Sequence, residues 1–263
     1  MTPRPGLAAT ICHVLREDAN LAEAIPVADR DRAVEECIAA AVRIPQGHWN
    51  AYQADIMRGG IGLLVLHGLL IRTVGVSGGS SAELLGEGDL LRPWQGEHAT
   101  PPLPHTTGWR VLKPVRVAVL DREVARRFSR YPELTGRLVA RELERSRNLA
   151  INMAIVQQPR VHIRVHMLLW HLANRWGYAV PEGILLPLRL THDLLADLVA
   201  ARRPTVSTAL AHLGKSGLVR PGRDGWLLAG RPPGELLELQ DRLPGRGERL
   251  VPPARTQENR VSG

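Results

Sequence analysis

Two short helical patterns joined by a four-residue connection constrain the fold of this chain more than any other part of its sequence. Thr191 can cap the first helix, because a threonine hydroxyl accepts a hydrogen bond from a free backbone N–H of the first turn. Pro204 suits the first position of the second helix, where its missing N–H is no loss, and Arg203 then stands at the cap. The inward-facing side chains are Leu194, Leu195 and Leu198 in the first helix and Val206, Leu210 and Leu213 in the second. With Ala196 allowing close approach, the segment predicts a helix-turn-helix.

The outward face of the second helix is small and polar. Its members are Thr205, Ser207, Thr208, Ala211 and His212. Such a face lets a helix settle into the major groove of DNA. Residues 217–220 and 226–228, joined by a tight turn at 221–225, predict a two-stranded wing. Across residues 160–230 nine Lys and Arg stand against four Asp and Glu, and a helical hairpin without a DNA role would not explain this basic rim.

Length, composition and charge limit the classes of protein to which this chain can belong. The length of 263 residues allows two modest domains or one large one, and 44% apolar with 23% charged residues excludes wholesale disorder. No apolar stretch reaches membrane-spanning length, and the start lacks the apolar core of a signal peptide, so we expect a cytoplasmic protein. A net charge of +8 favours a polyanionic partner. The sequence contains no signature of a catalytic triad, a phosphate-cradling loop or paired catalytic carboxylates, so we expect no enzyme.

The residue pattern of the N-terminal half changes at about residue 49, from helical periodicity to short apolar runs. Residues 1–48 are predicted to form short helices, most clearly at 28–38. Residues 49–120 contain short apolar runs broken by glycine, including separate strands at 61–68 and 69–76, and predict a small antiparallel β-roll. The proline-rich stretch 92–107 is predicted to be a loop.

A long helix is predicted over residues 121–158 and ends before Pro159. Gly136, Val139, Leu143, Ser146, Ala150, Met153 and Gln157 recur at alternating spacings of three and four. This heptad seam is the pattern of a helix that packs closely on a partner helix. The alternative is a single helix lying on its own domain. A further helix from 161 should end at Gly177, and residues 231–263 are expected to form one short helix at 234–242 and a mobile tail.

These features together resemble the Crp/Fnr superfamily of bacterial transcription regulators, over roughly residues 45–230. The resemblance rests on the strand roll, the Gly86-Glu87-Gly88-Asp89 turn, the long helix and the segment 190–219. It implies an α+β fold with four parts: N-terminal helices and an antiparallel, cyclic-nucleotide-binding-like roll (1–120), a dimerisation helix (121–158), a winged helix-turn-helix (159–230) and a tail (231–263). The dimer-interface residues would be Val139, Leu143, Ser146, Ala150 and Met153.

The resemblance also implies which residues contact DNA. Arg203 would read guanine, and Thr205 and Ser207 would contact phosphates or base edges. Arg202, Pro204, Thr208, His212, Lys215 and Arg223 complete the expected contact set. Pro204 replaces the glutamate of the family and Thr208 its second arginine, which allows apolar contact with a thymine methyl instead. Ala200 stands where the family commonly has glycine, and a positive φ there would cost about 1 kcal/mol.

The usual cyclic-AMP phosphate cassette of the family is not recognisable, so no cofactor is predicted. His105-Thr106-Thr107 occupies the place of its Arg-Ser/Thr pair. Arg92, Trp94, Glu97, Thr106 and Thr107 remain as candidate residues of an effector pocket. For Trp94 the alternative, and the commoner role of such a tryptophan, is to cover the roll. The Gly86–Asp89 turn is interpreted as structural, with the aspartate bonding its own backbone.

No metal-binding role is predicted for the histidines, and no sensor role for the cysteines. His162, His166 and His171 have no carboxylate or cysteine at ligand spacing, so no metal site is predicted. Cys12 and Cys37 are interpreted as small hydrophobic residues. The expected partners are double-stranded DNA and a second copy of the chain, with RNA polymerase and an unidentified small-molecule effector as further candidates and no membrane. The alternative function is a ligand-binding or protein-interaction module with a vestigial DNA-binding domain.

Overall fold

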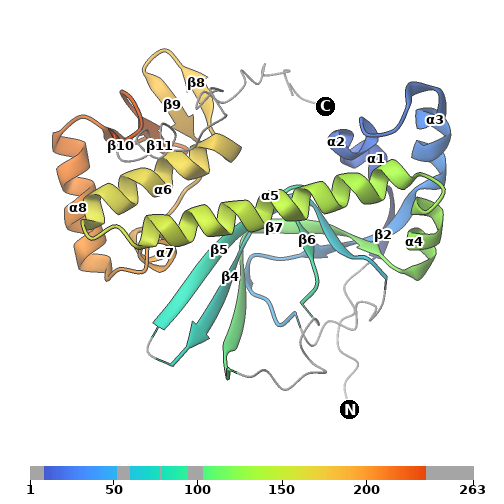
Figure 1. The fold of residues 1–263 in the computed structure, drawn as a ribbon, viewed down its shortest axis with the longest axis horizontal. Coiled ribbons are helices and arrows are strands. Elements are labelled where there is room, and N and C mark those ends of the chain that lie inside the picture. Colours follow the sequence, from blue (N-terminus) through green and yellow to red (C-terminus); the bar gives the residue numbers. More distant parts are fainter. Residues whose placement is uncertain (1–8, 52–59, 78, 94–102, 235–263) are drawn as a thin grey trace. The chain divides into compact units, whose positions relative to one another are not determined.

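The computed structural model describes residues 9–51, 60–77, 79–93 and 103–234. These residues group into two compact units, divided between Leu149 and Ala150, which we call unit 1 and unit 2. Unit 1 contains a β-sheet with helices, and unit 2 contains helices and a small sheet (Figure 1). Among the described residues, no helix has both the length and the apolar character needed to cross a membrane.

The sheet of unit 1 is antiparallel, in the order β1-β2-β7-β4-β5, with β3 on β7 and β6 on β4. Its strands are β1 Ala9–His13, β2 Ile38–Ile44, β3 Gly47–His48, β4 Gly62–Val76, β5 Gly79–Gly86, β6 Leu90–Leu91 and β7 Thr106–Leu120. Valine, isoleucine and leucine dominate the buried positions of β4 and β7, as expected for strands covered on both faces. This sheet confirms the predicted antiparallel architecture.

The first 48 residues do not form helices alone, which corrects the sequence prediction. Helices α1 Val14–Glu17, α2 Ala19–Ala22 and α3 Val27–Glu36 are present, but β1 precedes them and β2 follows them. The two strands pair with each other, and β2 also pairs with β7. Strand pairing of this kind is decided by the distant β7, and therefore a local pattern could not reveal it.

Residues 62–76 form one strand, where the sequence predicted two. The register of β4 against β7 shifts between Val65 and Leu70, and Gly68 lies at φ +104° inside the irregular stretch. A Cβ at Gly68 would stand 2.3 Å from the carbonyl oxygen of Pro114. Gly68 therefore accommodates a bulge against β7 and does not turn the chain. The predicted loop 92–107 also runs two residues too far, because Thr106 and Thr107 already pair with β4.

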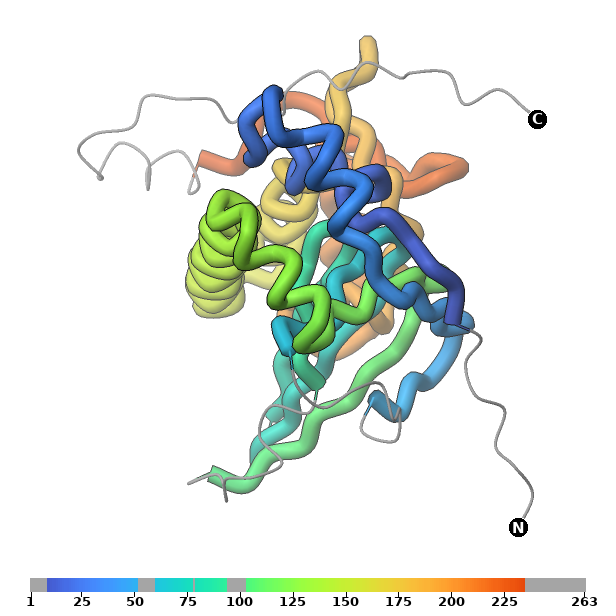
Figure 2. The backbone as a smooth tube through the Cα atoms, turned by 90° about the vertical axis from the view of Figure 1, so that its right-hand side faces the viewer, coloured from blue at the N-terminus to red at the C-terminus, as the bar shows by residue number. Residues whose placement is uncertain are grey.

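The predicted helix 121–158 is two helices, α4 Arg122–Phe128 and α5 Pro132–Val156. Asp121 caps α4 by accepting hydrogen bonds from the backbone N–H groups of Glu123 and Val124, each at 2.8 Å. Pro132 restricts the residue before it and begins α5, so the chain breaks at 129–131. Figure 2 shows α1 to α3 gathered beside α4 and the start of α5.

Two apolar clusters form the core of unit 1. One lies between the sheet and helices α1 to α5 and contains Leu15, Leu21, Phe128, Leu134 and Leu138. Cys12 and Cys37 belong to this cluster as free, buried thiols, and burial raises the pKa of Cys37 to about 11, which agrees with a role as plain hydrophobic residues. The other cluster lines the opposite face of the sheet and contains Leu70, Leu85, Val111, Trp49 and Trp109.

Unit 2 confirms the predicted helical block and wing. Its helices are α6 Val161–Trp176, α7 His192–Leu198 and α8 Arg203–Lys215. Its strands are β8 Tyr178–Val180, β9 Gly183–Leu186, β10 Val219–Pro221 and β11 Trp226–Leu228, in the antiparallel order β10-β11-β9-β8. The pair β8 and β9 was not predicted. The predicted helix at 234–242 and the tail lie outside the described residues.

Candidate functional site

Helices α7 and α8 form the predicted helix-turn-helix. The hydroxyl of Thr191 accepts a hydrogen bond from the backbone N–H of Leu194 at 3.2 Å, which confirms the predicted cap. The predicted inward side chains are all buried: Leu194, Leu195, Leu198, Val206, Leu210 and Leu213. Because the apolar faces of both helices are buried in unit 2, the polar face of α8 remains outside.

The turn between the helices has the left-handed residue that the sequence predicted as a possibility. Ala200 lies at φ +50°, which places an alanine where glycine would be unstrained. Arg164 of α6 supports this turn, because its Nη1 donates to the carbonyl oxygens of Val199 at 2.8 Å and Ala200 at 3.2 Å. Sequence reasoning did not identify Arg164 as a support of the turn.

The start of α8 differs by one residue from the prediction. Arg202, not Arg203, is the N-cap residue, and α8 begins at Arg203 with Pro204 directly after it. Proline is tolerated anywhere in the first turn, since those N–H groups have no partner within the helix. The hydroxyls of Ser207 and Thr208 each donate to the carbonyl oxygen four residues earlier, at 3.1 Å.

The expected DNA-contacting residues lie together at α8 and the wing. Ser207 is half-buried, and the other eight are exposed: Arg202, Arg203, Pro204, Thr205, Thr208, His212, Lys215 and Arg223. Arg223 lies apart from α8 in sequence, in the turn between β10 and β11. An exposed helix N-terminus flanked by a hairpin can present side chains to a groove and its phosphates.

Two residues of α7 that sequence reasoning missed also reach this surface. The carboxylate of Asp193 pairs with Nε of Arg203 at 3.2 Å, and Nδ1 of His192 lies 2.8 Å from the hydroxyl of Ser207. Both residues directly follow the cap Thr191, so their place in the first turn of α7 was a usable signal. They link the N-terminal turns of α7 and α8.

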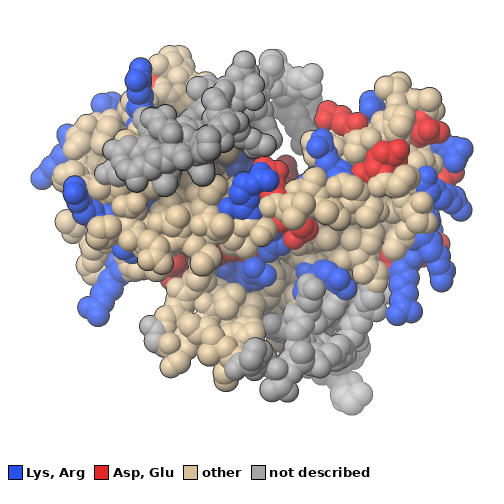
Figure 3. All heavy atoms as spheres, in the orientation of Figure 1, with Lys and Arg blue, Asp and Glu red and all other residues tan. Residues whose placement is uncertain are grey.

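Basic side chains outnumber acidic ones across residues 160–230 of unit 2. On the face drawn in Figure 3, Lys and Arg outnumber Asp and Glu around α8. Some of this charge is balanced locally, since Arg189 pairs with Asp224 at 3.1 Å and Arg203 with Asp193. The remaining excess is suited to a phosphate backbone.

One face of α5 carries the predicted seam. Val139, Leu143, Ser146, Ala150 and Met153 are all exposed, and Leu143 and Met153 are 62% and 69% exposed. Leu134 and Leu138, on the opposite side of the helix, are buried in unit 1. The seam is therefore an apolar strip on this chain without a covering segment among the described residues.

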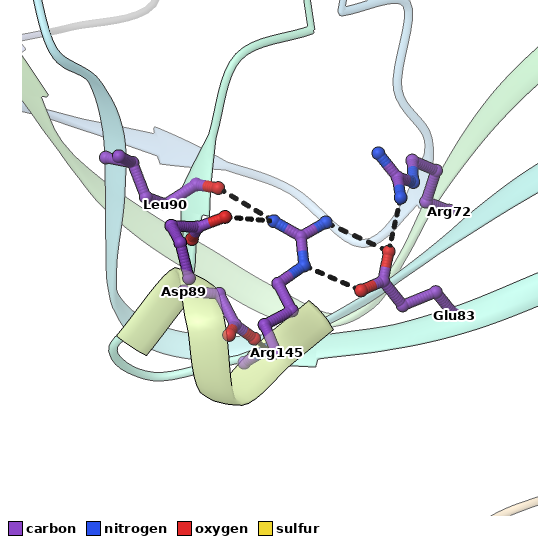
Figure 4. Close-up of polar contacts among 7 residues, drawn as sticks. Arg72, Glu83, Asp89, Leu90 and Arg145 are labelled. Atoms are coloured by element: carbon purple, nitrogen blue, oxygen red, sulfur yellow. Dashed lines mark hydrogen bonds and ion pairs between the residues drawn. The ribbon is translucent and has the colours of Figure 1, made fainter. Parts of the chain in front are cut away.

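Opposite that strip, α5 is joined to the sheet by a cluster of charged side chains (Figure 4). Arg145 donates to both carboxylate oxygens of Glu83, at 2.6 and 2.9 Å, and to the carbonyl oxygen of Leu90 at 3.1 Å. Glu83 also forms an ion pair with Arg72, whose Nη2 lies 2.7 Å from Oε2 of Glu83. Burial alone would lower the pKa of Arg145. The hydrogen bond to Glu83 and the negative charge of Glu83 have a larger, opposite effect, so the pKa of Arg145 is raised. Burial raises the pKa of the neighbouring Glu142, and the charge of Arg145 opposes that rise.

The turn before β6 is structural, as predicted. Oδ2 of Asp89 accepts a hydrogen bond from the backbone N–H of Gly86 at 2.7 Å. Of the candidate effector residues, Arg92 is exposed after β6, and Thr106 and Thr107 stand opposite Gly75 and Val74. Trp94 and Glu97 lie outside the described residues. Sequence reasoning missed the Arg72, Glu83 and Arg145 cluster, which is assembled from β4, β5 and α5.

The histidines of α6 make protein contacts. His166 accepts a hydrogen bond from the indole N–H of Trp170 at 3.0 Å, and the ring of His162 lies 4.7 Å from that of His212. Burial lowers the pKa of His171. Over the described ranges, no group of three or more His, Cys, Asp or Glu is arranged to hold a metal ion.

Comparison with known proteins identifies the C-terminal part. Residues 163–229 match the family of Crp-like helix-turn-helix domains. Over 127 residues the chain is 35% identical to a protein of Mycobacterium tuberculosis described as a CRP-like cAMP-activated global transcriptional regulator. That match covers 45% of this chain and 54% of the relative, so the chain spans about half the length of the curated relatives it matches.

Solved structures share the fold over more of the chain. A CooA mutant from Carboxydothermus hydrogenoformans has a TM-score of 0.57 at 16% identity, covering 89% of this chain and 97% of that one. FixK2 from Bradyrhizobium japonicum has a TM-score of 0.52 at 16% identity, covering 76% and 96%. These likenesses confirm the predicted fold class, an N-terminal antiparallel sheet domain with helices and a C-terminal helix-turn-helix.

Proposed function

Because residues 163–229 belong to the family of Crp-like helix-turn-helix domains and the chain has the fold of Crp/Fnr regulators, we propose that it is a sequence-specific DNA-binding transcription regulator of that type. The observation that carries the proposal is the exposed N-terminal face of α8, held outward by the buried packing of α6, α7 and α8. Binding to the chromosome would place the protein in the cytoplasm.

In this proposal α8 enters the major groove. Arg203 reads guanine with its guanidinium, and Asp193 lies on Nε of the same group. The hydroxyl protons of Ser207 and Thr208 are engaged by helix carbonyls, so these residues offer oxygen lone pairs and, for Thr208, a methyl group. This supports apolar contact of Pro204 or Thr208 with a thymine methyl. Arg202, Thr205, His212, Lys215 and Arg223 surround this reading edge and suit phosphate or base-edge contacts.

We further propose that two copies pair through the exposed seam of α5. Val139, Leu143, Ser146, Ala150 and Met153 place small and apolar side chains along one strip, as close helix packing requires. A two-fold dimer would present two α8 helices to half-sites about 34 Å apart on a near-palindromic site. An effector that favours one setting of the α5 pair would change that spacing, and RNA polymerase is a candidate partner for the bound dimer.

Titration of the protein against genomic DNA fragments and random DNA tests the proposal. Arg203→Ala should lower affinity for a selected fragment by about 1–3 kcal/mol and reduce discrimination against random DNA. Arg160→Ala removes the same charge from the exposed N-cap of α6 and serves as the control, with a small and uniform loss. Weak wild-type binding that is indifferent to sequence would instead support the alternative, a ligand-binding or protein-interaction module with a vestigial DNA-binding domain.

A further inference from the structure

Arg203, the first residue of α8, is connected to α7 at two points. Nε of its guanidinium forms an ion pair with Oδ1 of Asp193 at 3.2 Å. Its main-chain carbonyl oxygen accepts a hydrogen bond from the hydroxyl of Ser207 at 3.1 Å, and Nδ1 of His192 lies 2.8 Å from the same hydroxyl oxygen. Asp193 and His192 are neighbours in the first turn of α7. One turn of α7 therefore restrains both the side chain and the backbone of Arg203.

The direction of the hydrogen bond between His192 and Ser207 follows from counting protons. A hydroxyl carries one proton and a carbonyl oxygen can only accept, so the proton of Ser207 points at the carbonyl of Arg203. Nδ1 of His192 must then carry the proton that it shares with Ser207. The neutral imidazole is therefore fixed in the tautomer that has its proton on Nδ1, and the same hydrogen bond orients the ring.

Asp193 determines which edge of the guanidinium is available to a ligand. Among the described residues, Asp193 is the one group paired with the guanidinium of Arg203, and it lies at Nε. Guanine offers O6 and N7 as adjacent acceptors in the major groove, and a guanidinium binds such a pair through two N–H groups at once. Because Nε is turned toward Asp193, the donor pair left for guanine is the terminal one, Nη1 and Nη2.

The exposure of the ion pair limits what it contributes. The side chains of Arg203 and Asp193 are 66% and 67% exposed, so their pairing adds little to the stability of unit 2. An exposed arginine has many rotamers and loses them when it binds. A carboxylate that restricts those rotamers beforehand reduces this loss, while the DNA phosphates repel its negative charge. Asp193 is therefore unfavourable for DNA binding in general and favourable at the base that Arg203 reads.

We propose that Asp193 and His192 are positioning residues that determine specificity: they orient Arg203 so that its terminal N–H groups meet O6 and N7 of a guanine. The inference deepens the proposed function and rests on it. A wild-type protein without preference among DNA sequences would refute both. A preference that survives the loss of Asp193 and of His192 would refute this inference alone.

Base-by-base substitution of a DNA fragment selected by the wild type measures the role of Asp193. Arg203→Ala first identifies the guanine that depends on Arg203. Asp193→Ala should reduce discrimination at that position about three- to tenfold and leave the other positions unchanged. The same variant should bind random DNA about twofold more tightly, since it removes a negative charge beside the phosphates. Damage to the fold would weaken both kinds of binding, so these opposite changes separate positioning from a structural defect.

Two further variants separate position from charge. Asp193→Asn keeps an oxygen acceptor beside Nε without the charge, so it should retain most of the discrimination and still bind random DNA more tightly. Asp224→Ala is the matched control, because Asp224 is also 67% exposed and pairs with an arginine, Arg189, at 3.1 Å. It should strengthen binding to random DNA without changing discrimination at any base. Equal discrimination by Asp193→Ala and Asp224→Ala would overturn the role of Asp193.

The role of His192 has a measurement that needs no DNA. At a pH where the ring is neutral, its ¹⁵N resonances should show the proton on Nδ1, and Ser207→Ala should release that tautomer. A neutral wild-type ring with its proton on Nε2 would overturn the role of His192. On DNA, His192→Phe should reduce discrimination at the Arg203-dependent guanine. His192→Asn, whose amide nitrogen can donate from the place of Nδ1, should retain it, and equal discrimination by His192→Phe and the wild type would be a contrary result.

Discussion

Arg164 joins three carbonyl groups of unit 2 through one guanidinium. Its Nε and Nη2 donate to the carbonyl oxygen of Gln158 at 3.0 and 2.6 Å, and its Nη1 donates to those of Val199 and Ala200. The latter two carbonyls belong to the turn between α7 and α8, where Ala200 is held at φ +50°. Arg164→Ala therefore removes the clamp on a strained turn and releases three acceptors.

The magnitude follows from those three acceptors. A hydrogen bond in a partly buried setting contributes about 0.5–1.5 kcal/mol net, so the loss should be about 2–4 kcal/mol in the free energy of unfolding of unit 2. For a domain of this size, each kcal/mol lowers the melting temperature by about 4–8 °C, which gives a drop of roughly 8–32 °C. The α7–α8 turn should also open more often in the native state.

Denaturant unfolding and amide hydrogen exchange of the full chain measure both effects. Arg164→Ala should accelerate exchange in α7 and α8, with unit 1 unchanged. Arg160→Ala removes an arginine from the exposed N-cap of the same helix and should stay within about 0.5 kcal/mol of the wild type. Equal stability of the two variants would refute the reasoning that Arg164 holds the turn.

Three further predictions concern other parts of the chain. Leu143→Arg should yield monomers in sedimentation, because it places a charge in the proposed apolar seam. Glu144→Arg, at an exposed position outside the seam, should leave the dimer intact. An intact Leu143→Arg dimer would contradict the proposed role of the seam. Glu83→Gln should destabilise unit 1 by about 3 kcal/mol in urea unfolding, since it leaves the mostly buried Arg145 and the partly exposed Arg72 without their shared carboxylate. A loss below that of exposed Glu87→Gln would be a contrary result. Burial lowers the pKa of His171 below its ordinary 6.5, so unfolded chains take up this proton first as the pH falls and the stability of unit 2 declines. His171→Gln should therefore lose less stability than the wild type between about pH 7.5 and pH 5.5, and identical losses would contradict the assignment.

Local sequence patterns predicted unit 2 well. Thr191, the inward leucines of α7 and the inward residues of α8 act within one turn or one helix, so their spacing alone predicts capping and burial. The wing was predicted from its turn residues at 221–225. The pair β8 and β9 was missed because three- and four-residue strands carry too little periodicity.

Unit 1 was predicted less well where the outcome depends on distant residues. The helical prediction for residues 1–48 was partly wrong because β1 and β2 are strands through their pairing with each other and with β7. Gly68 indicated a break between strands, but Pro114 of β7 requires the glycine inside one continuous strand. Asp121 and Pro132 were available signals for the break between α4 and α5, and the apolar periodicity of the longer segment obscured them.

The helix-turn-helix, its basic surroundings and the seam of α5 could be predicted from residue spacing alone, because each depends on neighbours within a few residues along the chain. Three features became visible only in the folded chain: Arg164 supports the turn, Asp193 and His192 reach α8, and Glu83 joins Arg72 to Arg145. Strand register and helix packing bring together side chains that lie tens of residues apart, and no local spacing records which of them will meet.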